Sequence, residues 1–299
     1  MTTSDGLLLV DKPAGMTSHD VVNRVRRAAR TRRVGHAGTL DPMATGLLVL
    51  GVGRATRLLT YLVGADKTYH ATIRLGQTTH TDDAQGDLIE SRGARVESEA
   101  ITPHVEAMTG AIQQVPSAVS AIKVDGQRAY TRVRAGEDVK LAPRSVTIHE
   151  FLVTSVAHNQ AADATPVTDI EATIRCSSGT YIRAIARDLG HALSTGGHLW
   201  QLRRSHVGPF SIDQAGPCPQ EGDDLVGSPA FMTLDQALMA AFPIRVATEV
   251  ETRALSYGQQ ITESAMNDVV GVLSPQGQAV ALVKNKEGRA APVIVFTPS

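Results

Sequence analysis

Short apolar runs closed by turn residues are the feature that most limits what this chain can fold into. The last sixty residues contain three such runs, Val269–Leu273, Ala279–Val283 and Pro292–Phe296. The turn signals Pro275-Gln276-Gly277 and Glu287-Gly288 separate them, which predicts a small β module. No regular strand–helix–strand spacing runs along the chain, which is compatible with an α+β fold and not with a doubly wound nucleotide-binding fold.

The length of 299 residues exceeds that of one compact domain, so we expect one large domain and a small appendage. The Gly-, Pro- and acid-rich stretch Asp213–Pro229 marks a loop near the end of the large domain. We therefore expect a large domain over 1–240 and a small one over 241–299.

The composition is that of an ordinary water-soluble protein, with 42% hydrophobic and 20% charged residues. No apolar run approaches the ~20 residues that span a bilayer, and the amino terminus lacks the pattern of a signal peptide. We expect no membrane association and a cytoplasmic location. Cys176 and Cys218 have no CxxC companions, so the sequence indicates neither a zinc site nor a disulfide framework.

A net charge of -1 gives no overall attraction for nucleic acid, so phosphate binding has to come from local basic clusters. One cluster runs from Arg24 to Arg33, beginning in a predicted helix, Val21–Arg30, for which Ser18 is the expected cap. It follows a predicted buried strand, Leu7–Val10. Its arginines are Arg24, Arg26, Arg27, Arg30, Arg32 and Arg33, with no acidic residue among them. A solvated helix face is one interpretation; we prefer a phosphate-contacting patch, because the run leads directly into the densest motif.

A second basic segment, Ala118–Arg144, has a composition that fits an insertion clamping an RNA backbone. Lys123 and Arg128 are its candidate contacts. An ordinary polar surface hairpin is an alternative that composition alone does not exclude. Further along, Ile170–Arg175 and Thr180–Leu189 predict a strand followed by an amphipathic helix.

The motif that carries chemistry runs from Gly35 to Leu50, GHAGTLDPMATGLLVL. It places one carboxylate, Asp41, in a loop stiffened by Pro42 and shaped by glycines, and the apolar stretch after Gly46 would anchor that loop to the core. Loops held on rigid scaffolds are where catalytic groups concentrate. Taken without further knowledge, however, an Asp-Pro turn is more often structural.

Several segments in order closely resemble the TruB-type tRNA pseudouridine synthases. They are Leu8-Val10-Asp11-Lys12-Pro13-Ala14-Gly15, Gly35–Arg57, Lys67-Thr68-Tyr69, Leu75-Gly76-Gln77, Ser120-Ala121-Ile122-Lys123, Ser178-Gly179-Thr180-Tyr181-Ile182-Arg183 and Leu202-Arg203-Arg204. Together they span Gly6 to about Val207, which is far more specific than a single short pattern. The tail after Ala241 resembles the small PUA-like RNA-binding module of this family.

The resemblance implies an α+β fold: a catalytic domain with a mixed, mainly antiparallel sheet and a small β-rich PUA-like domain. It implies isomerisation of the T-loop uridine (U55) of tRNA to pseudouridine, with no metal or cofactor. This agrees with the absence of a dinucleotide motif, a phosphate-binding loop and a metal cluster from the sequence. The implied partner is the tRNA T arm, bound by a monomer that requires no protein partner.

The resemblance also assigns the site. Asp41 matches the family's catalytic aspartate and must be ionised to act. Arg183 matches the active-site arginine, whose guanidinium would keep the pKa of Asp41 low. Tyr69 matches the tyrosine that packs on the target base, and Tyr181 and Leu202 complete an apolar wall. By their sequence context alone, Arg183 would be a surface arginine and Tyr69 a half-buried strand residue.

A stacked uridine has to be extruded before a side chain reaches it, and His36 is the candidate wedge. Its alternative role is that of a hydrogen-bonded loop histidine. Lys12 either holds the motif loop or touches phosphate; the structural role comes first. Whether Asp41 attacks the ribose C1′ or the uracil C6 stays open, because both routes use the same residues.

Two other classes of function compete with this hypothesis. A non-catalytic RNA-binding protein gains nothing from Asp41, which would repel phosphates. A hydrolase with Asp41 as nucleophile would need metal-binding carboxylates, and Thr79-His80-Thr81-Asp82-Asp83, the only candidate cluster, is typical of a solvated loop.

Overall fold

The structure is a computed structural model that describes residues 5–117, 123–124, 127–128, 141–266 and 268–297. It divides into two compact units built from discontinuous segments. The first unit comprises Met1–Asp41, Gly46–Val63 and Val207–Ser299, and the second comprises Pro42–Thr45 and Gly64–His206. The domain limits expected from the sequence, 1–240 and 241–299, stay a prediction.

The first unit is built around two strands whose apolar runs are buried on both faces. β1 (Gly6–Lys12) pairs antiparallel with β3 (Thr45–Val52), and β2 (Val34–His36) pairs antiparallel with β3. Three short strands lie nearby: β13 (Phe210–Ser211), β14 (Gly216–Pro217), which is parallel to β1, and β15 (Phe231–Thr233), which is antiparallel to it. The predicted strand Leu7–Val10 is therefore confirmed.

Helices cover this sheet on both sides, which explains why the strand sequences do not alternate. Leu8, Val10, Leu48 and Leu50 share a core with Val21, Val22 and Val25 of α1 (Ser18–Ala28). Leu7, Leu9, Leu47 and Val49 belong to a second core with residues of the 3-10 helix η1 (Gly53–Leu58), α2 (Leu59–Val63) and α6 (Leu234–Ala241).

The cap of α1 differs from the prediction. Thr17, and not Ser18, caps the helix: its Oγ1 accepts a hydrogen bond from the Asp20 N–H at 3.1 Å, and the Asp20 carboxylate accepts one from the Thr17 N–H at 2.9 Å. This reciprocal pair is a capping box. The helix therefore begins at Ser18, whose buried hydroxyl is used elsewhere.

The C-terminal part of the first unit is a five-stranded sheet, in the order β16 (Ile244–Val246), β18 (Val270–Leu273), β19 (Ala279–Lys286), β20 (Arg289–Val295) and β17 (Ile261–Thr262). The three apolar runs predicted as strands are β18, β19 and β20, so that prediction is confirmed. Its core includes residues of α7 (Glu249–Ser256), such as Leu255. The predicted loop Asp213–Pro229 is irregular apart from η2 (Ile212–Gln214) and β14.

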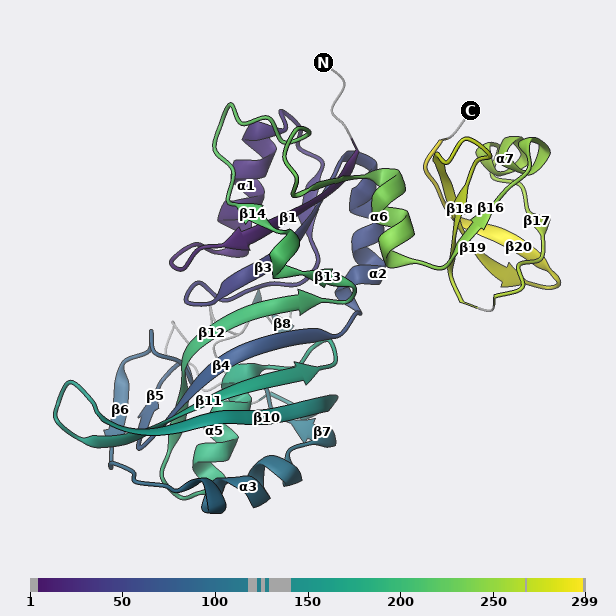
Figure 1. The fold of residues 1–299 in the computed structure, drawn as a ribbon. Coiled ribbons are helices and arrows are strands. Elements are labelled where there is room, and N and C mark those ends of the chain that lie inside the picture. The colour runs from purple at the N-terminus through teal and green to yellow at the C-terminus, as the bar shows by residue number, and fades with distance from the viewer. Residues whose placement is uncertain (1–4, 118–122, 125–126, 129–140, 267, 298–299) are drawn as a thin grey trace. The chain divides into compact units, whose positions relative to one another are not determined.

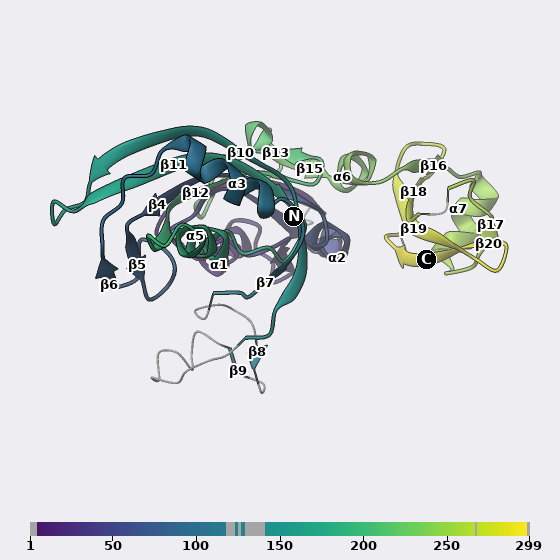
Figure 2. The same ribbon diagram turned by 90° about the horizontal axis from the view of Figure 1, so that it is seen from below.

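The second unit is an antiparallel sheet with helices on one side. Its strand order is β12 (Gly197–Val207), β4 (Lys67–Leu75), β11 (Pro166–Cys176), β10 (Arg144–Gln160) and β7 (Gly110–Gln114). Figures 1 and 2 show α5 (Ile182–Ala192) lying against one face of this sheet, beside α3 (Ser98–Ala107). Two short hairpins complete the unit: β5 (Gln77–Thr79) with β6 (Leu88–Ser91), and β8 (Lys123–Val124) with β9 (Gln127–Arg128).

The helix α5 begins two residues later than the prediction of Thr180. Gly179 adopts φ +87°, and the Thr180 hydroxyl donates to the Ser177 carbonyl at 2.9 Å, so the turn extends through Thr180. The expected fold class is confirmed: α+β, with mainly antiparallel strands and a β-rich C-terminal part. None of the helices within the described residues has the length and apolar character needed to cross a bilayer.

Candidate active site

The loop that carries Asp41 follows directly from β2. Gly35 lies close to Leu59: a Cβ at this position would be 2.9 Å from the Leu59 Cδ1 atom. Gly38 adopts φ +102°, a conformation that glycine reaches without strain. The Ala37 N–H then donates to the Val49 carbonyl at 2.9 Å, which anchors the start of the loop to β3.

The end of this segment is fixed by Ser18. Its Oγ accepts a hydrogen bond from the Leu40 N–H at 2.8 Å and donates to the Leu40 carbonyl at 3.2 Å. Ser18 and Leu40 are 2% and 3% exposed, so these bonds do not compete with water. The residue directly before Asp41 is thereby held to α1, and Asp41 itself is half-buried.

His36 and Lys12 lie in the same unit. His36 ends β2, where it pairs with Leu50, and its side chain is half-buried. Lys12 is fully buried, and its ammonium donates to the carbonyls of Pro13 at 3.0 Å and Met16 at 2.7 Å. These bonds close the turn after β1 and favour the structural role of Lys12 over a phosphate contact.

Arg24 and Arg26 of the first basic cluster are half-buried, and its other four arginines are exposed. Arg26 donates to the Asn23 side chain and to the Val34 carbonyl, so it connects α1 to β2. Arg27, Arg30, Arg32 and Arg33 are exposed. The exposed group is therefore the part of the cluster that is available to phosphates.

In the second unit, Tyr69 lies on β4 and is 8% exposed, and Leu202 lies on the neighbouring strand β12 with the same exposure. Lys67, two residues before Tyr69, is also buried, and its ammonium donates to the Ala65 carbonyl at 2.6 Å. Burial, helped by the nearby charge of Arg204, lowers the pKa of Lys67 to about 8.

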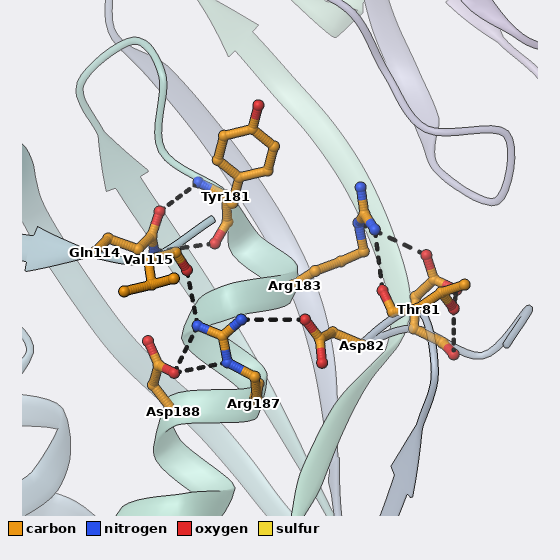
Figure 3. A network of polar contacts seen from close by, with 9 residues as sticks. Thr81, Asp82, Gln114, Val115, Tyr181, Arg183, Arg187 and Asp188 are labelled. Carbon is orange, nitrogen blue, oxygen red and sulfur yellow. Dashed lines mark hydrogen bonds and ion pairs between the residues drawn. The ribbon is translucent and has the colours of Figure 1, made fainter. Parts of the chain in front are cut away.

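Tyr181 and Arg183 open α5, which packs against β4. Arg183 is 5% exposed, so it is not the surface arginine that its sequence context alone suggests. Its Nη1 donates to the Thr81 carbonyl at 2.9 Å (Figure 3). Its Nε lies 3.6 Å from an oxygen of the Asp83 carboxylate. The guanidinium plane is thus held from one side by the segment after β5.

That segment was predicted to be a solvated loop, and the prediction is wrong. Thr79 and Asp83 are 7% and 5% exposed. The Asp83 carboxylate accepts hydrogen bonds from the Thr81 hydroxyl at 2.5 Å and from the Gln85 N–H at 3.0 Å. The buried Asp83 lies beside Arg183, and the half-buried Asp82 lies 3.2 Å from Arg187, so the segment supplies an anion to each of these arginines.

The second basic segment is described only in part. Lys123 and Arg128 face each other as a backbone pair of the β8–β9 hairpin. Residues 118–122, 125–126 and 129–140 lie outside the described residues, as do the side chains of Lys123 and Arg128. The proposed RNA clamp therefore stays a prediction.

The predicted site residues fall in both units. Asp41, His36 and Lys12 belong to the first unit, and Tyr69, Tyr181, Arg183 and Leu202 belong to the second. Within the second unit, the structure brings Tyr181 and Arg183 together at the start of α5, and it adds Asp83, which the sequence did not single out as functional.

The matching family models and relatives are all pseudouridine synthases. The family model described as "TruB family pseudouridylate synthase (N terminal domain)" matches residues 26–182, and the model "tRNA Pseudouridine synthase II, C terminal" matches residues 242–297. The chain is similar to tRNA pseudouridine synthase B of Arthrobacter sp. (strain FB24), with 54% identity over 98% of this chain and 97% of the relative. The enzyme of the same name from Thermobifida fusca (strain YX) is 53% identical over 99% of this chain and 100% of the relative.

Solved structures share the fold. A chain in the structure of an H/ACA RNP bound to a substrate RNA containing 2′-deoxyuridine has a TM-score of 0.71 at 21% identity, over 98% of this chain and 85% of that chain. A chain in the crystal structure of a Cbf5-Nop10-Gar1 complex has a TM-score of 0.70 at 22% identity, over 98% and 85%.

Proposed function

Because the chain belongs to the TruB family of pseudouridylate synthases, we propose that it isomerises the T-loop uridine of tRNA, U55, to pseudouridine, with Asp41 as the catalytic carboxylate. Identity above 50% over nearly the full length of relatives named tRNA pseudouridine synthase B carries the proposal. The two buried hydrogen bonds that hold Leu40, the residue before Asp41, support the assignment of Asp41 as the catalytic carboxylate.

The reaction exchanges one bond of the ribose for another. The C1′–N1 bond breaks, a C1′–C5 bond forms, the proton on C5 is lost and N1 gains one, so no oxidant or reductant is consumed. An ionised Asp41 assists by attacking either C1′ or C6, and both routes remain part of the proposal. The carboxylate is regenerated in the last step.

The other residues have supporting parts in this proposal. Arg183 supplies positive charge that favours an ionised aspartate. Tyr69 offers its ring to the target base, since stacking is worth on the order of 1–3 kcal/mol per base. His36 fills the space of the extruded uridine, and Tyr181 and Leu202 provide apolar contacts. Lys123 and Arg128 contact the RNA backbone.

The proposed substrate is the T arm of tRNA, bound by a monomer without a protein partner. The purified chain, incubated with unmodified tRNA and no other protein, is therefore the right preparation for the test. Carbodiimide labelling followed by primer extension locates pseudouridine in the product. We expect a signal at the T-loop uridine with the wild-type chain and none with Asp41→Asn.

The aspartate variant is a sharp control because asparagine keeps the size and the hydrogen-bonding capacity of the side chain but not its charge. Equal tRNA binding by both proteins, measured by filter binding, would show that Asp41→Asn removes chemistry and leaves recognition intact. Binding without any product from the wild-type chain would instead support the alternative of a non-catalytic RNA-binding protein.

A further inference from the structure

The end of strand β7 is hydrogen-bonded to the start of α5, where Tyr181 and Arg183 lie. Gln114, the last residue of β7, is 2% exposed. Its side-chain oxygen accepts a hydrogen bond from the Tyr181 N–H at 2.8 Å, and its side-chain nitrogen donates to the Tyr181 carbonyl at 3.1 Å (Figure 3). One buried amide thus holds both polar groups of the Tyr181 backbone.

Tyr181 is the residue that precedes the first turn of α5, and it has no side-chain cap of its own. Its carbonyl also accepts the first helical hydrogen bond, from the Ile185 N–H at 3.2 Å. The Gln114 amide therefore pairs with the N–H and the carbonyl of Tyr181, as the backbone of a neighbouring strand does in a sheet. It fixes the position of the Tyr181 backbone and the starting point of the helix, and hence the place of Arg183 two residues later.

A second hydrogen bond joins α5 to the residue that follows β7. The Arg187 Nη2 donates to the Val115 carbonyl at 2.8 Å, while its Nη1 lies 3.2 Å from the Asp82 carboxylate (Figure 3). Arg187 lies one helical turn after Arg183, so the two side chains share a face of α5. Both reach the same segment, Arg183 at Thr81 and Asp83, and Arg187 at Asp82.

We propose that Gln114 is a positioning residue for the isomerisation, which acts through the Tyr181 backbone and holds Tyr181 and Arg183 in their working orientation. This inference rests on the proposed function. A buried side chain that makes two hydrogen bonds to one backbone residue is costly to replace by an apolar group. The Tyr181 N–H would lose its partner, and the Tyr181 carbonyl would keep only the helical bond from the Ile185 N–H. Replacing Gln114 should therefore lower the reaction rate more than replacing an exposed glutamine on the same strand.

The chain contains a matched control one residue earlier. Gln113 lies on the same strand, but its side chain is exposed and donates to the Ser145 hydroxyl at 2.7 Å. Gln113→Leu and Gln114→Leu are the same chemical change at adjacent positions. We expect Gln114→Leu to lower the single-turnover rate at saturating tRNA by about 10- to 100-fold, the equivalent of one or two buried hydrogen bonds. We expect a change of less than about twofold from Gln113→Leu and little change in Kd from either.

Gln114→Glu adds a readout that a purely structural role would not move. Its carboxylate still accepts from the Tyr181 N–H, but it donates to the Tyr181 carbonyl only when protonated, and burial raises the pKa of such a carboxyl. The rate of this variant, divided by that of the wild type, should therefore rise as the pH falls. The melting temperature, measured at each pH, shows that folded protein is compared throughout.

The outcomes separate this inference from the proposed function. If the wild-type chain forms no pseudouridine, the proposed function fails. If the wild type is active but Gln114→Leu matches Gln113→Leu in rate, Gln114 has no positioning role. Where Gln114→Leu does not fold, the Glu variant decides alone: a rate ratio independent of pH overturns the inference.

Discussion

The hydroxyl of Ser18 bonds both backbone polar groups of Leu40, accepting from the N–H at 2.8 Å and donating to the carbonyl at 3.2 Å. Ser18 lies in the first turn of α1, twenty-two positions before Leu40 in the sequence. The helix therefore sets the position of the backbone that leads into Asp41.

Ser18→Ala should loosen the backbone at Leu40, because both hydrogen bonds of the hydroxyl are lost. Two buried backbone groups of Leu40 lose their partner, which costs about 1–3 kcal/mol in the free energy of unfolding. The single-turnover rate should also fall, because Asp41 is no longer held in one direction. Urea unfolding and rate measurements on tRNA check both. Ser211→Ala is the control, since Ser211 caps the short helix η2 far along the chain from the motif; equal rates for the two variants would contradict the prediction.

The fold of the chain was largely readable from the sequence, because its strands are marked by local patterns. Leu7–Val10 and the three C-terminal runs are apolar segments between turn residues, and they form β1, β18, β19 and β20. The cap of α1 was misplaced by one residue, because Thr17 and Ser18 are both good capping residues. Only the position of Asp20, three residues after Thr17, distinguishes them.

The candidate site was readable only in part, for a physical reason. Arg183 and Asp83 are a hundred positions apart, so no local sequence pattern predicts that the buried guanidinium pairs with this carboxylate. The Thr79–Asp83 segment has a polar composition, which is typical of a solvated loop. Its burial follows from tertiary packing against β12, where Asp83 forms a backbone bridge with Leu199.

Arg183→Lys should lower the isomerisation rate by at least about tenfold, because an ammonium cannot reproduce the planar set of donors that a guanidinium offers. The lysine would also not span the two contacts, with Thr81 and Asp83, that hold Arg183. Single-turnover rates on tRNA measure this. Arg175→Lys, at a half-exposed arginine of β11, makes the same change elsewhere. Near-native rates for Arg183→Lys would show that charge alone matters at this position.

Asp83→Asn should destabilise the chain, because it removes the anion from a buried ion pair. Breaking such a pair costs up to about 3–5 kcal/mol. The loss should be smaller when Arg183→Met is present as well, since the uncompensated charge is then gone. Chemical unfolding of the two single variants and the double variant gives the coupling free energy. A coupling near zero would mean that the 3.6 Å approach of the two side chains contributes nothing.

The exposed arginines in the last turn of α1 and just after it should contribute to tRNA affinity through phosphate contacts. Replacing Arg27 and Arg32 by Gln should flatten the dependence of log affinity on log salt by about 0.7 to 0.9 for each phosphate contact that is lost. Binding titrations over a range of KCl concentrations measure the slope. Arg92 and Arg95, which are exposed in the second unit, give a control pair with the same change in charge. An unchanged slope for the variant would identify Arg27 and Arg32 as solvated surface residues.

His36 offers the clearest separation between a role in recognition and a role in structure. If it fills the space of the extruded uridine, His36→Ala should slow the reaction on folded tRNA, where unstacking costs a few kcal/mol. A short, flexible uridine-containing loop has less stacking to break, so its rate should change much less. If His36 instead supports the loop after β2, both substrates should slow equally and the melting temperature should fall, since the half-buried ring lies at the strand end that leads to Asp41. Single-turnover rates on the two RNAs, beside the melting temperature of each protein, distinguish the cases. Equal rate losses with a lowered melting temperature would remove His36 from the extrusion step and leave it as part of the scaffold that holds Asp41.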